Sequence, residues 1–188
     1  MPILDHFGII APFYDRLIPL WHVQQLVSLA DLPVSGPLLD AGGGTGRVAQ
    51  ALQGLASEII VGDLSMGMLR QAKDRKGLAS ICSHTEFLPY PDESFARVIM
   101  VDALHHVHSQ TATANEIWRV LQKGGRIVIE EPDVRTLVVI LVAIAEKLVM
   151  MRSHFLAPQR IAALFPYANA RIQIERQGYN AWVIIDKE

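Results

Sequence analysis

Leu38-Leu39-Asp40-Ala41-Gly42-Gly43-Gly44-Thr45-Gly46 is the stretch from which the fold can be predicted, because a short apolar run passes directly into a glycine-rich turn. The run has the length and composition of a buried strand, and a helix is expected from about Arg47. Glycines adopt positive φ and let a ligand approach the backbone, while the first turn of a helix offers unpaired amides to an anion. The stretch therefore predicts a strand, a ligand-binding loop and a helix.

The spacing of the glycines argues against two common nucleotide-binding loops. Counted from Gly42, the dinucleotide fingerprint G-x-G-x-x-G needs a glycine where this chain has Arg47. The Walker phosphate loop needs Gly-Lys-Ser or Gly-Lys-Thr, which does not follow at the required distance. A nicotinamide enzyme and a nucleoside triphosphatase are therefore disfavoured. A merely tight connection would need fewer glycines, and it is the remaining alternative.

Short β-rich runs and amphipathic runs alternate on both sides of this loop. Strands are predicted over residues 37–40, 59–63, 78–83, 97–101 and 126–131, and helices from Gly46, from Met66 after the capping residue Ser65, and over 113–121 before Gly124. Residues 171–176 and 180–185 are spaced like an antiparallel hairpin. This order predicts the α/β class, with a single Rossmann-like, doubly wound sheet that is mostly parallel and ends in an antiparallel C-terminal hairpin.

Length and composition fit one globular domain. We expect residues 1–36 to form an N-terminal helical segment over the site, 37–131 the core, and 132–188 a helical segment and the hairpin. Of the 188 residues, 51% are hydrophobic and 19% charged, which excludes a disordered chain. The net charge of −2 leaves no basic excess for a phosphate backbone, so nucleic acid is not an expected partner. A single cysteine, Cys82, fits a reducing compartment, and the cytoplasm is expected.

Neither export nor a membrane span is expected from the sequence. Residues 1–10 lack the positive region that opens a signal peptide. The longest aliphatic run, 137–145, falls well short of the roughly 20 apolar residues that a bilayer crossing requires. By length the run 137–151 is predicted to be a helix, although its β-branched residues also suit a buried strand.

A second site residue follows the next strand. Residues 59–65 form a β-branched run that ends in Asp63, Leu64 and Ser65. In an open parallel sheet the carboxyl end of this strand lies beside the glycine loop. A carboxylate there can accept both hydrogens of a ribose diol. The alternative is that Asp63 only caps a turn.

Further motifs follow in a fixed order along the chain. They are Thr85-Glu86-Phe87-Leu88-Pro89-Tyr90-Pro91, Ser94-Phe95, His105-His106-Val107 and the run Arg-Val-Leu-Gln-Lys-Gly-Gly at 119–125. With the glycine loop and Asp63, they resemble the class I S-adenosylmethionine-dependent methyltransferases, specifically the small-molecule branch similar to the ubiquinone/menaquinone biosynthesis C-methyltransferases. Phe13-Tyr14-Asp15 resembles the family's N-terminal segment over the active site. The resemblance covers about residues 7–125.

The resemblance implies that S-adenosyl-L-methionine is the cofactor. It assigns the residues of the cofactor site as follows: the methionine end to Asp40, Gly42, Gly44 and Gly46, the ribose to Asp63, one adenine face to Leu64, and the far end of the adenine to His84 and Thr85. The family usually has an acid where this chain has His84, which puts the adenine contact in doubt, with Glu86 as a substitute. An aspartate and a proline of the family are replaced by Ala96 and Lys123, which we interpret as surface variation.

Methyl transfer from a sulfonium needs a positioned acceptor, and it needs a base only if the acceptor loses a proton. His105 is the candidate base, with His106 and Asp102 beside it, and Tyr14 is the candidate that closes the pocket. The alternatives are that both histidines only shape the turn after the fourth strand and that Tyr14 is core. No metal is expected.

The leading functional hypothesis is methyl transfer to a small organic acceptor. The resemblance implies that the segment after the fifth strand helps to roof the acceptor site, so the apolar composition of 137–151, with Met150 and Met151, favours a lipophilic acceptor. The alternatives are a helix packed on the sheet or a homodimer contact. A second hypothesis, favoured by His84, is a nonenzymatic module that keeps the fold and binds S-adenosylmethionine. A nicotinamide oxidoreductase ranks third.

Overall fold

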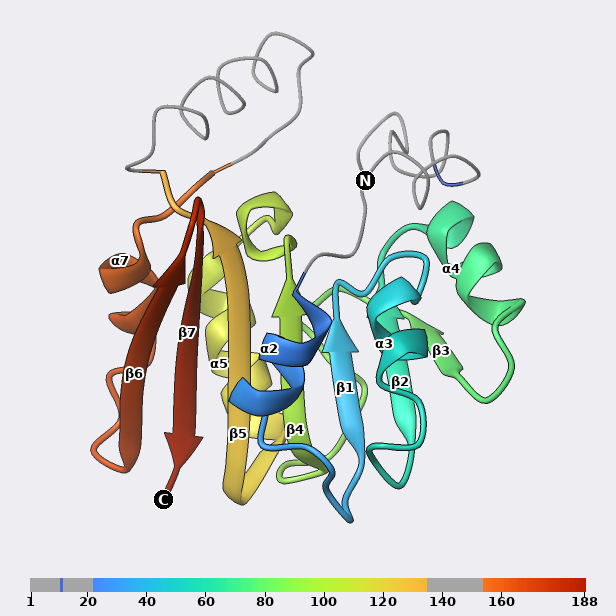
Figure 1. Cartoon of the computed structure of the whole chain (residues 1–188), viewed down its shortest axis with the longest axis horizontal. Coiled ribbons are helices and arrows are strands. Elements are labelled where there is room, and N and C mark those ends of the chain that lie inside the picture. The colour runs from blue at the N-terminus through green and yellow to red at the C-terminus, as the bar shows by residue number, and fades with distance from the viewer. Residues whose placement is uncertain (1–10, 12–21, 135–153) are drawn as a thin grey trace, which may run out of the picture.

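The computed structural model of the protein describes residues 11, 22–134 and 154–188 and contains a seven-stranded mixed sheet (Figure 1). Its strands are β1 (Leu38–Ala41), β2 (Ile59–Asp63), β3 (Ala79–Cys82), β4 (Phe95–Val101), β5 (Leu121–Pro132), β6 (Ala170–Gln177) and β7 (Asn180–Lys187). Their order is β3-β2-β1-β4-β5-β7-β6. The first five strands are parallel, and β7 is antiparallel to both β5 and β6. The predicted α/β class with a C-terminal hairpin is confirmed.

Helices cover both faces of the sheet (Figure 1). They are α2 (Val23–Leu29), α3 (Arg47–Ala51), α4 (Met66–Lys73), α5 (Gln110–Val120) and α7 (Pro158–Ala162), together with the 3-10 turn η1 (Leu104–His106). On one face, α2, α3 and α4 contribute Leu26, Val48 and Leu69 to a hydrophobic cluster. On the other face, α5 and α7 contribute Ile117 and Ile161 to a second cluster. This two-sided cover is the doubly wound arrangement predicted from the alternating runs.

The helix boundaries follow from side-chain caps. The hydroxyl of Ser65 accepts a hydrogen bond from the amide of Met68 at 3.2 Å, as predicted. The start of α5 lies three residues earlier than expected, because the hydroxyl of Ser109 accepts from the amide of Ala112. The strand β5 also begins earlier than predicted, at Leu121, where it pairs with the first residue of β4. Leu121 continues the apolar period of α5, so the sequence pattern alone did not show where β5 begins.

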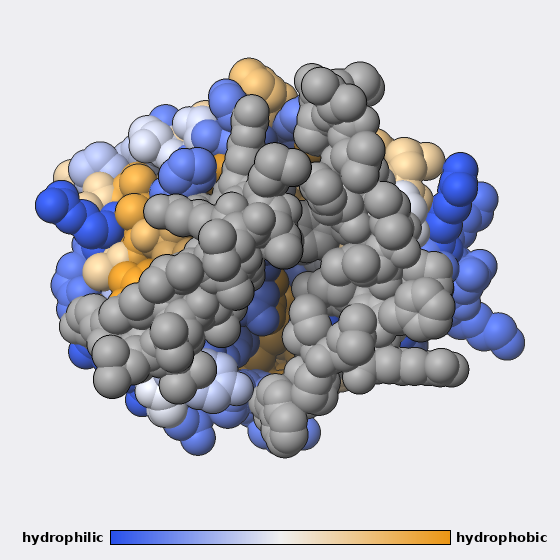
Figure 2. Space-filling model, turned by 90° about the horizontal axis from the view of Figure 1, so that it is seen from above, coloured by the Kyte–Doolittle hydropathy of each residue, from blue (hydrophilic) through white to orange (hydrophobic). Residues whose placement is uncertain are grey.

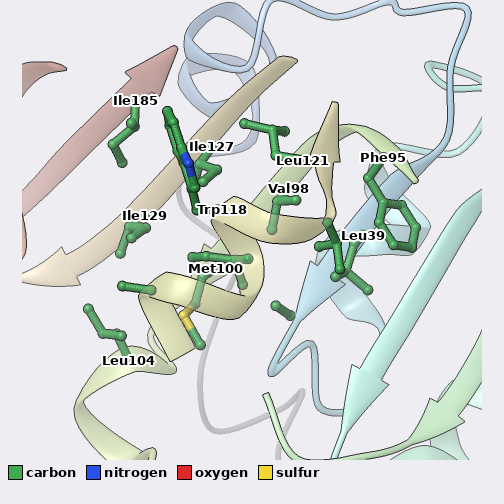
Figure 3. Packing of buried hydrophobic residues seen from close by; sticks show 14 of the residues in the cluster. Leu39, Phe95, Val98, Met100, Leu104, Trp118, Leu121, Ile127, Ile129 and Ile185 are labelled. Atoms are coloured by element: carbon green, nitrogen blue, oxygen red, sulfur yellow. The ribbon is translucent and has the colours of Figure 1, made fainter. Parts of the chain in front are cut away.

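The larger hydrophobic cluster fills the space between the sheet and α5. Figure 3 shows Leu39, Met100 and Ile127 on three neighbouring strands and Trp118 on α5 among the side chains of this cluster. All four are buried. Truncating a buried side chain of this size to alanine typically costs about 2–5 kcal/mol. The cluster therefore holds the strand ends that carry the site in a fixed arrangement.

Some predictions lie outside the described residues. These are the helix over 137–151 and the segment that contains Phe13 and Tyr14. The division into 1–36, 37–131 and 132–188 stays a prediction as well. Within the part of the chain that the structure describes, no helix combines the length and the apolar character needed to cross a membrane.

The hairpin is tied to the core through a buried lysine near its end. The ammonium of Lys187 donates to the carbonyl oxygens of Trp118 at 3.0 Å and of Leu121 at 2.6 Å, at the C-terminal end of α5. It also lies 5.2 Å from the centre of the Trp118 ring. A cation at a helix C-terminus satisfies carbonyls that the helix leaves unpaired.

We expect Lys187→Met to lower the free energy of unfolding by about 1.5–3 kcal/mol, because two carbonyls lose a charged donor while the aliphatic stem is kept. Chemical denaturation measures the change. The matched control is Arg171→Met on the exposed face of β6, which should stay within about 0.5 kcal/mol of the parent. Equal losses in the two variants would contradict the capping role.

Candidate ligand-binding site at the strand ends

The glycine loop lies where the strand order of the sheet reverses, between β1 and β4, and in open α/β sheets ligands bind at this point. Gly42, Gly44 and Gly46 have φ angles of +73°, +55° and +72°, so the loop uses the left-handed conformations for which glycine was predicted. A Cβ on Gly42 would lie 2.6 Å from the Cβ of Ala103. The loop after β1 therefore packs directly on the turn after β4.

The structure brings the glycine loop and Asp63 together. The amide of Gly44 donates to Oδ2 of Asp63 at 2.9 Å, and the amide of Ser65 donates to Oδ1 at 2.7 Å. Of the residues that the structure describes, a Cβ on Gly44 would meet only the sulfur of Met68, at 3.9 Å, so they leave space beside this glycine. The carboxylate is thus held at the edge of the loop, as expected from the parallel order of the strands. Its contact with a ribose stays a prediction.

Asp40 is buried beneath the loop with a side chain that is only 1% exposed. Neither of its carboxylate oxygens has a hydrogen-bond partner of good geometry among the described residues, and the backbone of Ala49 and the charge of Arg47 offset its burial only in part. Burial, reinforced by the charge of Asp63, raises the pKa of Asp40 to about 7. A Cβ on Gly43 would lie 2.6 Å from Oδ2, so the backbone of the loop rests on this carboxylate. A buried carboxylate without a good hydrogen-bond partner is costly and indicates a partner that the described residues do not supply.

The residues assigned to the adenine differ in their exposure. Leu64 and Met66 follow β2 with 45% and 54% of their surface exposed, and they offer apolar contacts beside Asp63. His84 is also exposed. Thr85 is buried, and its hydroxyl lies 3.1 Å from the hydroxyl of Thr113 on α5. The structure therefore places Leu64 and His84 at the surface and turns Thr85 toward α5.

Glu86, the substitute considered for the adenine contact, serves the start of α5. Its Oε1 accepts hydrogen bonds from the amides of His108 and Ser109, at 2.9 and 3.0 Å. The carboxylate is buried there. These two amides belong to the turn that opens the helix, so the structure gives Glu86 a capping role.

The histidine pair occupies the turn η1 directly after β4. His105 is buried, and its Nδ1 lies 2.5 Å from Oε2 of Glu131. The ring stacks on Phe155 with 4.2 Å between ring centres and 15° between planes. His106 is a different case, since burial and the neighbouring His105 lower its pKa to about 3. The contact with Glu131 pairs His105 with a carboxylate.

Two acids at the end of β5 were missed by the sequence reasoning. Glu130 and Glu131 are both buried. Burial and the charge of Asp102 raise the pKa of Glu130 to about 7, and its Oε1 accepts from Asn180 at 2.8 Å. Asp102 itself has a φ of +51°, and its amide donates to the carbonyl oxygen of Glu130. Two consecutive acids at the carboxyl end of an apolar strand are the signal that could have revealed them.

The site is thus built from the ends of β1, β2, β4 and β5, and Figure 2 views the molecule from the corresponding side. Among the described residues, no group of three or more histidine, cysteine, aspartate or glutamate side chains is suited to hold a metal ion. A separate open groove of about 410 Å³ lies at α5 and α7. Its lining consists of Gln110, Thr111, Leu156, Arg160, Ala163 and Leu164. None of the predicted site residues belongs to it.

Comparison with known families matches residues 39–129 to a family model described as "Methyltransferase domain". The ubiquinone/menaquinone biosynthesis C-methyltransferase UbiE of Stenotrophomonas maltophilia is 33% identical over 113 residues, which are 55% of this chain and 45% of that protein. The demethylmenaquinone methyltransferase of Thermobifida fusca is 32% identical over 139 residues, 66% of this chain and 58% of that protein. The chain spans about half the length of the curated relatives that it matches.

Solved structures share the fold. An S-adenosylmethionine-dependent methyltransferase from Thermotoga maritima superposes with a TM-score of 0.75 at 21% identity and covers 97% of this chain and 99% of its own. The [4+2]-cyclase SpnF superposes with a TM-score of 0.72 at 18% identity, covering 92% and 81%. At these identities the likeness concerns the fold alone, and the cyclase illustrates that one fold can host different reactions.

Proposed function

The chain belongs to the methyltransferase-domain family through residues 39–129, of the class I S-adenosylmethionine-dependent kind, and we propose that it transfers a methyl group from S-adenosylmethionine to a small organic acceptor. The observation that carries the proposal is the buried carboxylate of Asp40, which has no good hydrogen-bond partner among the described residues and lies under a glycine loop whose Gly44 is hydrogen-bonded to Asp63. The family assignment and this geometry concern the same strand ends.

The residues present fit the cofactor. S-adenosylmethionine carries a cationic methionine end, and Asp40 offers to an ammonium group two buried oxygens that have no good hydrogen-bond partner in the part of the chain described. Asp63 and the exposed Leu64 would hold the ribose and one face of the adenine, next to the space beside Gly44. A pair of acids at adjoining strand ends favours a ligand that is positively charged at one end.

When bound, S-adenosylmethionine supplies an activated methyl carbon, so the protein has to orient the acceptor and exclude water. We propose His105 as the proton acceptor for acceptors that lose a proton. Its position directly after β4, two residues beyond the contact of Ala103 with Gly42, supports this role. The role of Tyr14 over the pocket stays a prediction, since Tyr14 lies outside the described residues.

For the acceptor we propose an apolar ring compound. Two relatives support this choice, since one is named for ubiquinone and menaquinone biosynthesis and the other for demethylmenaquinone. The apolar run 137–151, which lies outside the described residues, supports it as well. If tail length of matched acceptors leaves turnover unchanged, the lipophilic proposal is wrong. Cytoplasmic location and a homodimer contact stay predictions from the sequence.

A binding module without turnover is the second candidate, favoured by the exposed His84 in place of the usual acid. Two measurements separate the candidates. Calorimetry with S-adenosylmethionine and S-adenosylhomocysteine, with NADH as the negative control, tests the binding that both candidates require. Release of S-adenosylhomocysteine during a screen of small hydroquinones and phenols then tests turnover. A folded protein that binds neither compound at millimolar concentration excludes both.

We expect Asp63→Ala to weaken binding of S-adenosylhomocysteine by about 1.5–3 kcal/mol, because the ribose loses a charged hydrogen-bond acceptor. The melting temperature should fall moderately as well, since the amides of Gly44 and Ser65 lose their partner. Calorimetry and thermal melting measure the two effects. Asp74→Ala, at an exposed acid after α4, is the control and should change neither. Unchanged affinity in Asp63→Ala would refute the ribose assignment.

A further inference from the structure

We propose that Glu131 is a positioning residue that fixes His105 in the tautomer able to accept the proton of the methyl acceptor. The inference rests on the proposed function and assigns a role to an acid that the sequence reasoning did not single out. The inference is based on three contacts that the buried carboxylate of Glu131, at the end of β5, makes with the turn after β4.

Both oxygens of Glu131 are committed to donors on the turn after β4. Oε1 accepts from the amides of Ala103 and Leu104, at 3.1 and 2.7 Å, and Oε2 lies 2.5 Å from Nδ1 of His105. The side chain is only 4% exposed. Carboxylate oxygens accept hydrogen bonds, so the arrangement that matches all three contacts has Oε2 as the acceptor and Nδ1 as the donor. Nδ1 of His105 must therefore carry a hydrogen.

This contact decides the other ring nitrogen. In a neutral imidazole one nitrogen is a donor and the other an acceptor, so a hydrogen on Nδ1 leaves the lone pair on Nε2. The ring orientation is fixed as well, since the ring of Phe155 stacks on one side with 15° between planes and the ring of His106 lies 3.9 Å away. The low pKa of His106, about 3, keeps this second ring neutral. The ring nitrogen of His105 that carries the lone pair is thus Nε2.

The position of the turn connects this pair with the site. Glu131 fastens the turn through Ala103 and Leu104, and Ala103 packs on Gly42 of the cofactor loop. The turn begins at Asp102, whose φ of +51° is a conformation that most residues adopt only under constraint. One carboxylate therefore sets both the place of the turn beside the loop and the tautomer of the histidine on it.

The chemical step balances without a further reactant. The acceptor atom forms a bond to the methyl carbon, the bond between that carbon and the sulfonium sulfur breaks, and its electron pair stays on the sulfur as a neutral thioether. The proton of the acceptor atom passes to Nε2 of His105. The resulting imidazolium is paired with the negative charge of Glu131 across the Nδ1 contact.

Glu131→Gln tests the role, because it replaces one oxygen by an NH₂ group with little change of shape. Its remaining oxygen can still accept from the amides of Ala103 and Leu104, so the turn keeps its fastening. The NH₂ group then faces Nδ1 of His105 as a donor, which favours the tautomer with the hydrogen on Nε2. That nitrogen can no longer accept a proton. We expect kcat to fall about 100-fold or more, the usual contribution of a general base, with KM and the affinity for S-adenosylhomocysteine within about twofold of the parent.

Nitrogen-15 spectra of the histidine rings read the tautomer without any acceptor. We expect hydrogen on Nδ1 of His105 in the parent and on Nε2 in Glu131→Gln. His105→Asn is the second variant, and combining it with Glu131→Gln should cost nothing further if the two residues act as a unit. Glu175→Gln, at an exposed position of β6, is the matched control and should match the parent.

The outcomes separate this inference from the proposed function. A parent with hydrogen on Nε2 of His105, or a Glu131→Gln enzyme that keeps the parent's kcat, overturns the positioning role. Additive losses in the double variant also overturn it. A parent that neither binds S-adenosylhomocysteine nor turns over counts against the proposed function, whereas the tautomer spectra still decide whether Glu131 fixes His105.

Discussion

Gly44→Val is expected to abolish binding of S-adenosylmethionine, with a loss of at least 100-fold in affinity. Gly44 has a φ of +55°, which a β-branched residue adopts only under strain of roughly 1–3 kcal/mol. Its Cβ would point into the space where the described residues place only the sulfur of Met68, 3.9 Å away. That space lies beside Asp63, which the proposed function assigns to the ribose, so the new side chain and the cofactor compete for it.

Gly54→Val provides a matched control for the backbone strain. Gly54 has a φ of +82°, and a Cβ there meets no described residue within 4 Å. It lies in the turn after α3, away from the strand ends. Both variants should lose stability in thermal melts, but only Gly44→Val should lose the calorimetric signal of S-adenosylhomocysteine. Normal binding by folded Gly44→Val would show that the loop is only a connection.

The second large effect is expected at Asp40, where one substitution should move stability and binding in opposite directions. The pKa of Asp40 is about 7 in the folded protein, against an ordinary value of 3.8. Below about pH 4 the carboxyl is neutral in both states, so its burial carries no charge penalty. As the pH rises from about 4 through 7, the unfolded chain loses this proton more readily, and the stability of the free protein falls.

Asp40→Asn cannot ionise and should not show this part of the decline. The shift of about three pKa units corresponds to roughly 4 kcal/mol, an upper limit because the amide also needs partners. We therefore expect the free variant to melt above the parent at pH 8 and to bind S-adenosylhomocysteine at least tenfold more weakly. Melting curves from pH 5 to 8 and calorimetry at pH 8 measure the two effects.

Glu130 complicates the parent's curve, because its pKa is also raised to about 7. Glu130→Gln should remove the part of the stability decline that Glu130 causes. The stability of the double variant Asp40→Asn with Glu130→Gln should depend least on pH. Asp74→Asn, at an exposed acid, serves as the control. The assignment to Asp40 fails if Asp40→Asn melts with the full pH dependence of the parent.

Most strands of the sheet were predictable because the apolar, β-branched composition of each run indicates a buried strand. The run 59–63 was predicted residue for residue, since an isolated β-branched run between turn signals leaves little choice. The start of β5 was not, because Leu121 continues the apolar period of α5, and only its pairing with β4 makes it a strand. A local sequence pattern does not indicate which distant strand a residue will pair with.

The site residues also fall into those found by local motifs and those whose contacts depend on distant parts of the chain. Asp40, the glycines and Asp63 sit in local motifs, and the structure brings them together as expected. His105 was found by its motif, but its pairing with Glu131 depends on the neighbouring position of β4 and β5. Thr85 was assigned to the adenine from its motif, but its hydroxyl faces Thr113 on α5, a helix that the motif does not include.

The place of β7 between β5 and β6 imposes an order of assembly. β6 is made before β7, yet its only strand partner in the described sheet is β7, so it cannot join the sheet until β7 has been incorporated. The two strands can form a hairpin early, because they are joined by a tight turn at Gly178 and Tyr179. Until that hairpin docks, β7 exposes an unpaired edge. It also exposes the side chains of Trp182 and Val183, which are buried in the folded protein. Such an intermediate is the species most prone to pair with another chain, so refolding yields should fall with protein concentration.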